Sequence, residues 1–342
     1  MPGLILKLLT RRTILGYCLL FTFWSCEKKS CREDEGSVSP SEPLKIIRLE
    51  DSLAALKDTH QTRLLLRRHP LFSEKYLNWS RLPGDSILIN DIFRIAKSPF
   101  NDTLRMDVKR EFPDLNFLQE DLSNFFNHTR YYYTNFHDPV IYTLTAGYGV
   151  DMDVKDSVVV IGLEYFLSDS ARYIPRDPVS GMVIPTYIRK RMKKPFILPS
   201  LAMVVADRYC KNDVLDNSML GEMLKWGRIY YFMEKTLPCM PDSILCGYSA
   251  AETEEVQNNL KAIWAHFSEQ QLFFSTNLFL IRKYCDERPN VVEIGEKCPG
   301  RIGRWLGWQI VRNWASEKKI PLQKVMQESN CRKIFNESGF RP

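Results

Sequence analysis

Histidine, serine and carboxylate side chains carry most acid–base and nucleophilic chemistry, yet in this chain of 342 residues they form no common catalytic motif. None of the five histidines begins an H-E-x-x-H pattern, and neither a G-x-S-x-G nucleophile elbow nor a phosphate-binding loop is present. Asp151 and Asp153 alternate as calcium ligands do, but the glycine and glutamate that complete such a loop do not follow. The sequence therefore predicts no catalytic residues, no metal ligands and no cofactor.

The most distinctive segment for binding or packing is Pro299 to Arg312, which reads PGRIGRWLGWQIVR. Gly300, Gly303 and Gly307 would share one face if this segment is helical. Each glycine costs about 1 kcal/mol against alanine inside a helix, so three on one face need a reason. Close packing of another element is the favoured reason, and access of a ligand to the backbone is the alternative.

The other side chains of this segment form a candidate surface for interaction or packing. Arg301 with Trp305, and Arg304 with Trp308, are spaced four residues apart, which suits cation–π contacts along a helix. The complete set of candidate residues for interaction or packing is Gly300, Arg301, Gly303, Arg304, Trp305, Gly307, Trp308 and Gln309.

The N-terminus predicts export and a lipid anchor. A basic stretch precedes an uncharged apolar run from Thr13 to Trp24, which is too short for a stable membrane span. Ser25 and Cys26 follow where the run stops and resemble the cleavage site of bacterial lipoproteins, although Trp24 is bulkier than usual there. We therefore expect a signal peptide at 1–25, lipidation of Cys26 and a polar, flexible tether at 26–43. An uncleaved signal anchor and an ordinary cleaved signal are the alternatives.

The charge and the cysteine content limit the functional classes to which the protein can belong. After removal of the signal peptide the chain carries 44 basic and 41 acidic residues, with no basic stripe interleaved with aromatics, which argues against nucleic-acid binding. Beyond Cys26 the mature chain has seven cysteines and no C-x-x-C pair. An oxidising envelope would permit disulfides. Cys239 and Cys246 are the nearest pair in sequence, but the connectivity cannot be deduced.

The pattern along the chain predicts helices, then a small sheet, then more helices. Aromatic and β-branched residues favour strands at Tyr131–Tyr133, 139–146 and 157–163, with a glycine-rich turn between the last two. This order predicts one α+β, mostly helical domain with a small central β-sheet over residues 44–342. The expected helices are 45–68, 86–96, 104–110, 114–128, 197–210, 216–236, 249–267 and 300–317.

The order of several segments resembles the gliding motility lipoprotein GldB family of the Bacteroidetes. The resemblance implies a part in the envelope machinery for gliding and type IX secretion, without giving a mechanism. The matching segments are 46–50 (IIRLE), 130–133 (RYYY), 160–167 (VIGLEYFL), 185–188 (PTYI), 223–232 (MLKWGRIYYF), 263–267 (IWAHF) and 299–311.

A remoter resemblance is to zincin-type metalloproteases, in which one helix carries H-E-x-x-H and the next supplies a glutamate before a glycine. The corresponding helix here, at 199–210, contains neither histidine nor glutamate, and Trp226 stands before Gly227. A catalytic zinc needs about three protein ligands. The resemblance thus implies a zincin-like single domain without zinc chemistry.

Together these features predict a non-catalytic envelope component. We expect the lipid on Cys26 to hold it at the membrane beside envelope protein partners, on the periplasmic face of the outer membrane, because Lys28 and Lys29 rather than acidic residues follow the lipidated cysteine. The alternatives are a divergent zincin-like hydrolase and a periplasmic lipoprotein that binds a ligand or glycan through its aromatic side chains.

Overall fold

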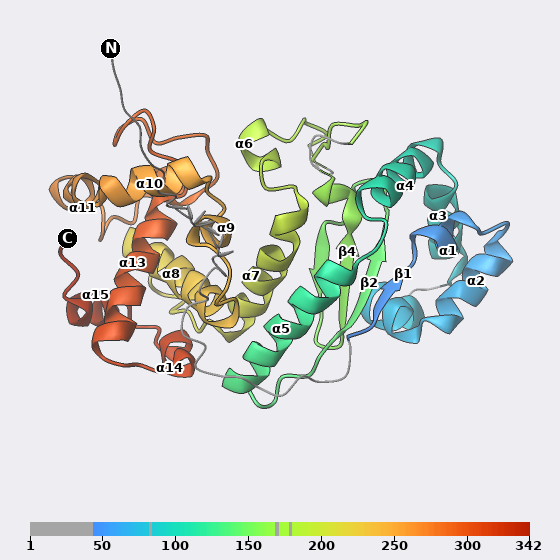
Figure 1. The fold of residues 1–342 in the computed structure, drawn as a ribbon, viewed down its shortest axis with the longest axis horizontal. Helices are drawn as coiled ribbons and strands as arrows, with labels where there is room; N and C mark the ends of the chain where they lie inside the picture. Colours follow the sequence, from blue (N-terminus) through green and yellow to red (C-terminus); the bar gives the residue numbers. More distant parts are fainter. Residues whose placement is uncertain (1–43, 82–83, 168–170, 178–179) are drawn as a thin grey trace, which may run out of the picture. The chain divides into compact units, whose positions relative to one another are not determined.

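The structure, a computed structural model, describes residues 44–81, 84–167, 171–177 and 180–342. The predicted signal peptide and tether, including Cys26, lie outside these residues. The described residues form a mostly helical α+β fold with one small sheet, as the sequence predicts (Figure 1).

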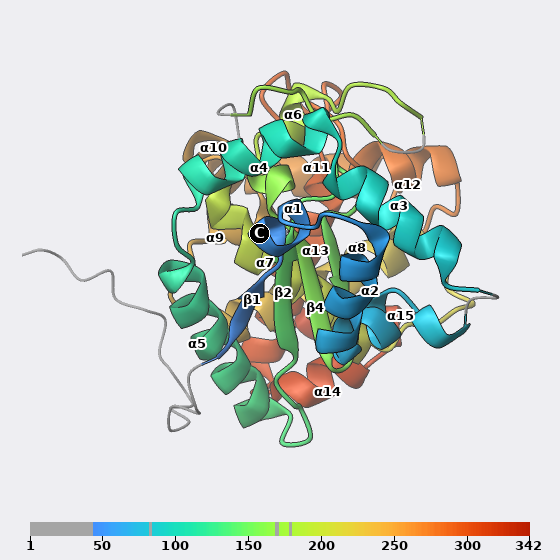
Figure 2. The ribbon, with the colours of Figure 1, turned by 90° about the vertical axis from the view of Figure 1, so that its right-hand side faces the viewer.

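The sheet has four strands in the order β1-β2-β4-β3. Strands β1 (Ile46–Arg48), β2 (Val140–Leu144) and β4 (Val158–Gly162) are parallel (Figure 2). Strand β3 (Met152–Val154) pairs antiparallel with β4. The sheet is therefore mixed, and the carboxyl ends of its three parallel strands lie at the same end of the sheet.

Hydrophobic cores lie on both faces of this sheet. Val158 and Val160 of β4 pack into the smaller core with buried side chains of residues 49–96, whereas Val159 and Ile161 pack into the larger core with the helices of residues 99–132 and those that follow β4. Every residue of β4 is buried, which explains its continuous run of apolar residues. The smaller core contains Leu53 of α1 (Glu50–Ala54).

The first helices precede β2. Helix α2 begins at a side-chain cap, in which Asp58 accepts a hydrogen bond from the backbone N–H of Gln61. The elements are α1 (Glu50–Ala54), α2 (Thr59–Arg68), η1 (Phe72–Tyr76), η2 (Trp79–Arg81), α3 (Ser86–Ala96), α4 (Pro99–Glu111) and α5 (Asn116–Tyr132).

The later helices follow β4 and contribute most of the larger core. Helix α10 begins with a capping box between Ser249 and Glu252. The elements are η3 (Leu163–Phe166), α6 (Thr186–Arg189), η5 (Lys194–Phe196), α7 (Ile197–Tyr209), α8 (Met219–Thr236), α9 (Asp242–Cys246), α10 (Ala250–Asn258), α11 (Leu260–Glu269), α12 (Leu278–Cys285), α13 (Ile302–Glu317), α14 (Leu322–Gln327) and α15 (Cys331–Ser338).

Four sequence predictions of local structure are corrected. The expected helix at 45–68 begins with strand β1, because Ile46–Arg48 finds a parallel partner in β2. Tyr131 and Tyr132 end helix α5 instead of forming a strand. Strand β3 occupies the region expected to be only a turn, and the helix expected at 249–267 is two helices, which meet at Asn259.

Candidate functional site

Helices α8 and α13 pack against each other through glycines. A Cβ added to Gly307 would lie 2.0 Å from the carbonyl oxygen of Met223, and one on Gly227 would lie 2.4 Å from the carbonyl oxygen of Gly307. Gly303 and Gly300 are equally restricted, by the Cys285 sulfur at 2.7 Å and the Arg288 carbonyl oxygen at 2.2 Å. Gly303 and Gly307 of α13 therefore serve close packing, whereas Gly300 precedes the helix, so the predicted stripe of three glycines is not formed on it.

The arginines of this segment stack on other aromatic rings than the sequence predicted. Arg304 lies over Trp226, 3.8 Å from the ring centroid, and Arg301 lies over Tyr248 at 5.4 Å. Arg301 is buried and donates a hydrogen bond to the carbonyl oxygen of Gly247 at 3.0 Å. The predicted pairs along α13 are replaced by contacts with Trp226 of α8 and with Tyr248, which lies in the turn between α9 and α10.

Trp305 and Trp308 are buried and so do not present a partner surface. The indole N–H of Trp308 donates to the Glu234 carboxylate at 2.9 Å, and Arg312 lies 4.2 Å from the centroid of the Trp308 ring. Gln309 is a half-buried acceptor for Arg312 at 3.4 Å. This set of residues joins α13 to α8.

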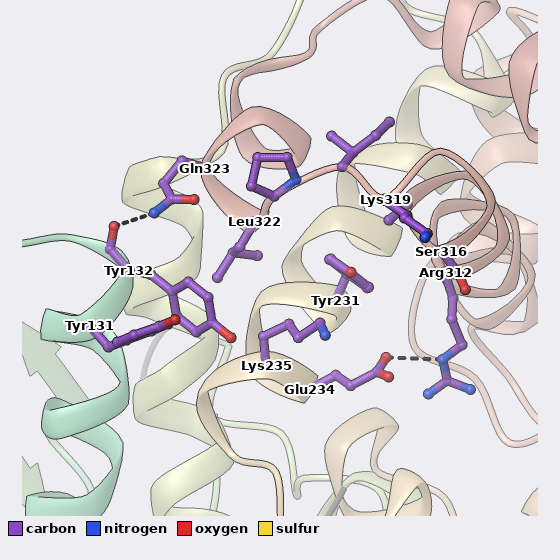
Figure 3. Close-up of a pocket in the computed structure, with 13 residues that line it drawn as sticks. Tyr131, Tyr132, Tyr231, Glu234, Lys235, Arg312, Ser316, Lys319, Leu322 and Gln323 are labelled. Carbon is purple, nitrogen blue, oxygen red and sulfur yellow. Dashed lines mark hydrogen bonds and ion pairs between the residues drawn. The ribbon is translucent and has the colours of Figure 1, made fainter. Parts of the chain in front are cut away.

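A groove opens beside this helix pair, at the ends of α5, α8 and α13 and the start of α14 (Figure 3). It has a volume of about 890 Å³. We name it the C-terminal groove. It is lined by Tyr131, Tyr132, Tyr231, Glu234, Lys235, Arg312, Ala315, Ser316, Lys319, Ile320, Pro321, Leu322 and Gln323.

The charged side chains that line the C-terminal groove differ in the hydrogen bonds and ion pairs that they make. The Glu234 carboxylate accepts hydrogen bonds from Trp308 and from Arg312 at 3.0 Å, and Arg312 also bonds Asp242 at 2.9 Å. Within the described part of the chain, no carboxylate pairs with Lys319. The groove thus presents the Lys319 ammonium group beside tyrosine rings.

The groove has a single carboxylate, Glu234, among its described lining residues. Its lining residues include neither histidine nor cysteine, and Glu234 is held by two donors. Across the described ranges no three histidine, cysteine, aspartate or glutamate side chains gather as metal ligands. Helix α7, at the position of the zincin ligand helix, buries Leu201, Ala202 and Val205 in the larger core.

A second unusual group lies where the parallel strands end. Glu164 follows β4 and is 1% exposed, and its Oε1 accepts hydrogen bonds from the backbone N–H groups of Ala146 at 2.7 Å and Tyr148 at 3.1 Å. The pKa of Glu164 is raised to about 7, chiefly by burial and also by the nearby Glu50 carboxylate, while the backbone N–H donors act to lower it. Glu164 thus changes charge near neutral pH.

Only part of the groove carries a signal in the sequence. The tyrosines at 131–133 stood out by composition, but Tyr133 stacks on Tyr209 with centroids 3.8 Å apart, which leaves Tyr131 and Tyr132 to line the groove. Lys235 and Lys319 had no distinguishing pattern, because surface lysines are common. Glu164 lay within the recognised 160–167 segment, although no local signal marked its burial.

Cys239 and Cys246, the nearest pair of cysteines in sequence beyond Cys26, do not form a disulfide. Cys246 is a buried free thiol, so it does not pair with Cys239, which is disulfide-bonded. Burial raises the pKa of the Cys246 thiol to about 12, which keeps it protonated and unreactive.

These features define a class of protein: a mostly helical α+β domain with a closely packed helix pair and a cationic, tyrosine-lined groove. The chain belongs to the family of the gliding motility protein GldB, whose family model matches residues 31–342. No curated protein and no solved structure matches the chain, so the likeness to zincin-type metalloproteases has no support. Among the described helices, none is both long and apolar enough to cross a membrane.

Proposed function

We propose that this protein is a non-catalytic component of the gliding motility and type IX secretion machinery, held by a lipid on Cys26 at the periplasmic face of the outer membrane. The observation that carries the proposal is the family match over residues 31–342. The serine and cysteine at the end of the apolar run support the anchor, and Lys28 and Lys29 support the periplasmic face. Partners are other proteins of the same envelope assembly.

Complementation of a deletion strain tests the role and the anchor together. The wild-type gene should restore colony spreading and type IX secretion, if the strain has these activities. The matched variant carries Cys26→Ala behind a signal that ordinary signal peptidase cleaves, so that the same domain is exported without a lipid. We expect this variant to restore neither activity fully. Full rescue by the lipid-free domain would refute the need for an anchor, and normal spreading and secretion in the deletion strain would refute the role.

Two measurements test the other parts of the proposal. A periplasmic domain should survive protease treatment of intact cells and be digested after the outer membrane is opened. Digestion in intact cells would place it on the cell surface instead. Metal analysis of the purified domain should find no stoichiometric zinc, and a tightly bound equivalent of zinc would favour the hydrolase alternative.

The C-terminal groove supports a second candidate function, which is binding of an anionic ligand such as an acidic sugar. The observation is the combination of Lys319 with three tyrosines around a volume of about 890 Å³. Calorimetric titration of the domain with a uronic-acid oligosaccharide, with a neutral oligosaccharide of equal length as control, tests it. Binding of the acidic probe alone is expected, and equal or absent binding of the two would refute it.

A further inference from the structure

Two arginine side chains, Arg191 and Arg301, meet over Gly247 at the start of helix α13. Arg191 follows the short helix α6, whereas Arg301 is the N-cap residue of α13. Gly247 has a φ of 69°, and a Cβ there would lie 2.5 Å from the Cδ atom of Arg191 and 3.2 Å from the Nη2 atom of Arg301. The bare backbone of this glycine therefore lets both side chains lie close together.

These two arginines share one carboxylate. Glu287 pairs with the Nη2 atom of Arg191 at 2.8 Å and with the Nε atom of Arg301 at 3.4 Å, and within the described ranges no other carboxylate pairs with either. The start of α13 adds the partial positive charge of a helix N-terminus. Burial, and after it the charge of Arg301, lower the pKa of Arg191. The cluster thus carries an excess of positive charge.

A buried tyrosine hydroxyl group lies beside this pair of arginines. Tyr230 of α8 is 1% exposed, and its ring packs against that of Trp308 with centroids 5.6 Å apart. Its hydroxyl is close enough to act against burial and raise the pKa of both arginines. Among the residues that the structure describes, this hydroxyl has no hydrogen-bond partner. A buried polar group without a partner costs stability, so Tyr230 indicates that a bound group completes the site.

The cluster is open to solvent on one side. The side chains of Glu287 and Arg191 are partly exposed, whereas that of Arg301 is buried. Arg191 and Glu287 therefore form the rim of the site, and Arg301 and Tyr230 form its floor. A small ligand can thus reach the buried donors from the surface of the domain.

We propose that this cluster binds a phosphate group, either as the free ion or as the terminal monoester of a larger ligand. Arg191, Arg301 and Tyr230 supply donors from three separate segments of the chain. The Nη1 atom of Arg301, like the Tyr230 hydroxyl, has no hydrogen-bond partner among the described residues, so both are available to an incoming oxygen. Guanidinium groups and a helix N-terminus are the groups that hold phosphate in many proteins.

The number of donors and the excess charge favour phosphate over a carboxylate. A phosphate monoester presents three strong acceptor oxygens and nearly two negative charges, whereas a carboxylate has two oxygens and one charge. Three converging donors and an unbalanced arginine match the former. This site is separate from the C-terminal groove, and it does not depend on the lipid anchor.

Calorimetric titration of the purified lipoprotein with inorganic phosphate tests the site. The titration is made at about pH 8, where phosphate is mostly the dianion, and sodium chloride keeps the ionic strength constant. We expect one equivalent of phosphate to bind per chain and the melting temperature to rise with the phosphate concentration. Absence of binding at constant ionic strength would overturn the proposal.

Tyr230→Phe separates binding from a structural role. The variant keeps the ring that packs against Trp308 and loses only the hydroxyl, which has no described partner. We therefore expect its melting temperature without phosphate to be at least that of wild type, and its affinity for phosphate to fall about tenfold. Tyr131→Phe makes the same change at an exposed ring outside the site and should leave the affinity unchanged. Wild-type affinity in Tyr230→Phe would refute the assignment.

Arg191→Gln tests the charge at the rim. This variant should bind phosphate about tenfold more weakly, because it removes one of the two guanidinium groups. Lys190→Gln is the matched control, since it removes the same charge from the exposed side chain of the adjacent residue. If both variants weaken binding equally, phosphate responds only to the general charge of the surface and the site is overturned.

Two further probes identify the source of the phosphate group. Glycerol 3-phosphate is a terminal monoester, and affinity equal to or above that of inorganic phosphate would assign the site to a phosphorylated ligand. Weaker binding of this probe would assign it to the free ion, and either result supports the site. Dimethyl phosphate has the diester linkage of a phospholipid headgroup and a single charge, so it should bind about tenfold more weakly than inorganic phosphate. Equal binding of the diester would overturn the assignment to a terminal phosphate.

Discussion

Two buried residues with ionisable side chains, Arg228 and Glu164, differ in how fully their polar atoms are hydrogen-bonded. The Arg228 guanidinium is 1% exposed, and it donates hydrogen bonds to the carbonyl oxygens of Lys211 at 2.6 Å and Glu328 at 2.7 Å. Glu164 has donors for one carboxylate oxygen, but within the described residues its Oε2 has no hydrogen-bond partner. The arginine is thus a structural link between distant segments, whereas the glutamate is a buried acid that favours its neutral form.

Glu164 makes the stability of the fold depend on pH. Below about pH 4.5 the carboxyl group is protonated in both the folded and the unfolded chain, so it contributes no difference. Between pH 4.5 and about 7 the unfolded chain releases a proton that the folded chain retains, so the folded state loses stability as the pH rises. The raised pKa corresponds to a loss of about 3 kcal/mol, complete above pH 7.

Glu164→Gln should remove this loss. We expect the free energy of unfolding of the variant, relative to wild type, to rise by about 3 kcal/mol between pH 4.5 and 7 and to stay level above that. Urea unfolding at a series of pH values measures it, with Glu254→Gln on the exposed side of α10 as control. If the free energies of unfolding of Glu164→Gln and wild type differ by the same amount across this pH range, the raised pKa of Glu164 is contradicted.

At the scale of elements, the contact between α8 and α13 organises the C-terminal half. The two helices approach so closely that the backbone of each occupies the space of a side chain on the other, at Gly227 and Gly307. Trp308 and Arg312 then join the helices through Glu234 of α8. The walls of the C-terminal groove are formed by the ends of this same pair.

Gly307→Ala tests this close approach. The new Cβ would meet backbone atoms of Met223, which cannot rotate away, so the helices must separate. We expect the overpacking, about 1–3 kcal/mol, to exceed the roughly 1 kcal/mol gained in helix propensity and to lower the melting temperature. Gly295→Ala is the control, since a Cβ there meets nothing within 4 Å. A Gly307→Ala protein as stable as Gly295→Ala would show that the helix pair can adjust.

At the scale of the whole molecule, the central sheet lies between two hydrophobic cores of unequal size. The C-terminal groove is at the surface of the larger core, where α5 meets α8, α13 and α14. Its wall is closed by long-range contacts, among them the hydrogen bond from the Gln323 amide to the carbonyl oxygen of Tyr132 at 2.6 Å (Figure 3).

Reversal of one charge tests the groove as a binding site. Lys319→Glu should weaken binding of a uronic-acid oligosaccharide about tenfold, because a carboxylate then faces the anion. Lys318→Glu is the matched control, since it makes the same change of net charge at the adjacent residue, which does not line the groove. Calorimetric titration of both variants at equal ionic strength measures the effect. Equal weakening by the two would indicate only a general effect of charge.

Local patterns in the sequence predicted much of the helical framework. The helix at 86–96 matches α3, and those expected at 197–210, 216–236 and 300–317 match α7, α8 and α13 within a few residues. Apolar spacing and capping residues act between positions three or four apart, so one segment contains the whole signal. Gly303 and Gly307, which lie in one helix, are both closely packed, but the predicted stripe of three does not form on α13, because Gly300 precedes the helix.

Only the tertiary structure decided which side chains meet. The three residues of β1 form a strand because β2, almost a hundred positions away, offers them hydrogen bonds. Arg304 stacks on Trp226 instead of Trp308, and Arg228 bonds the carbonyl oxygen of Glu328, 100 positions later. The burial of Glu164 and the walls of the groove likewise depend on elements far apart in the chain. Such contacts follow from how complete helices and strands pack, and spacing within any one segment does not encode them.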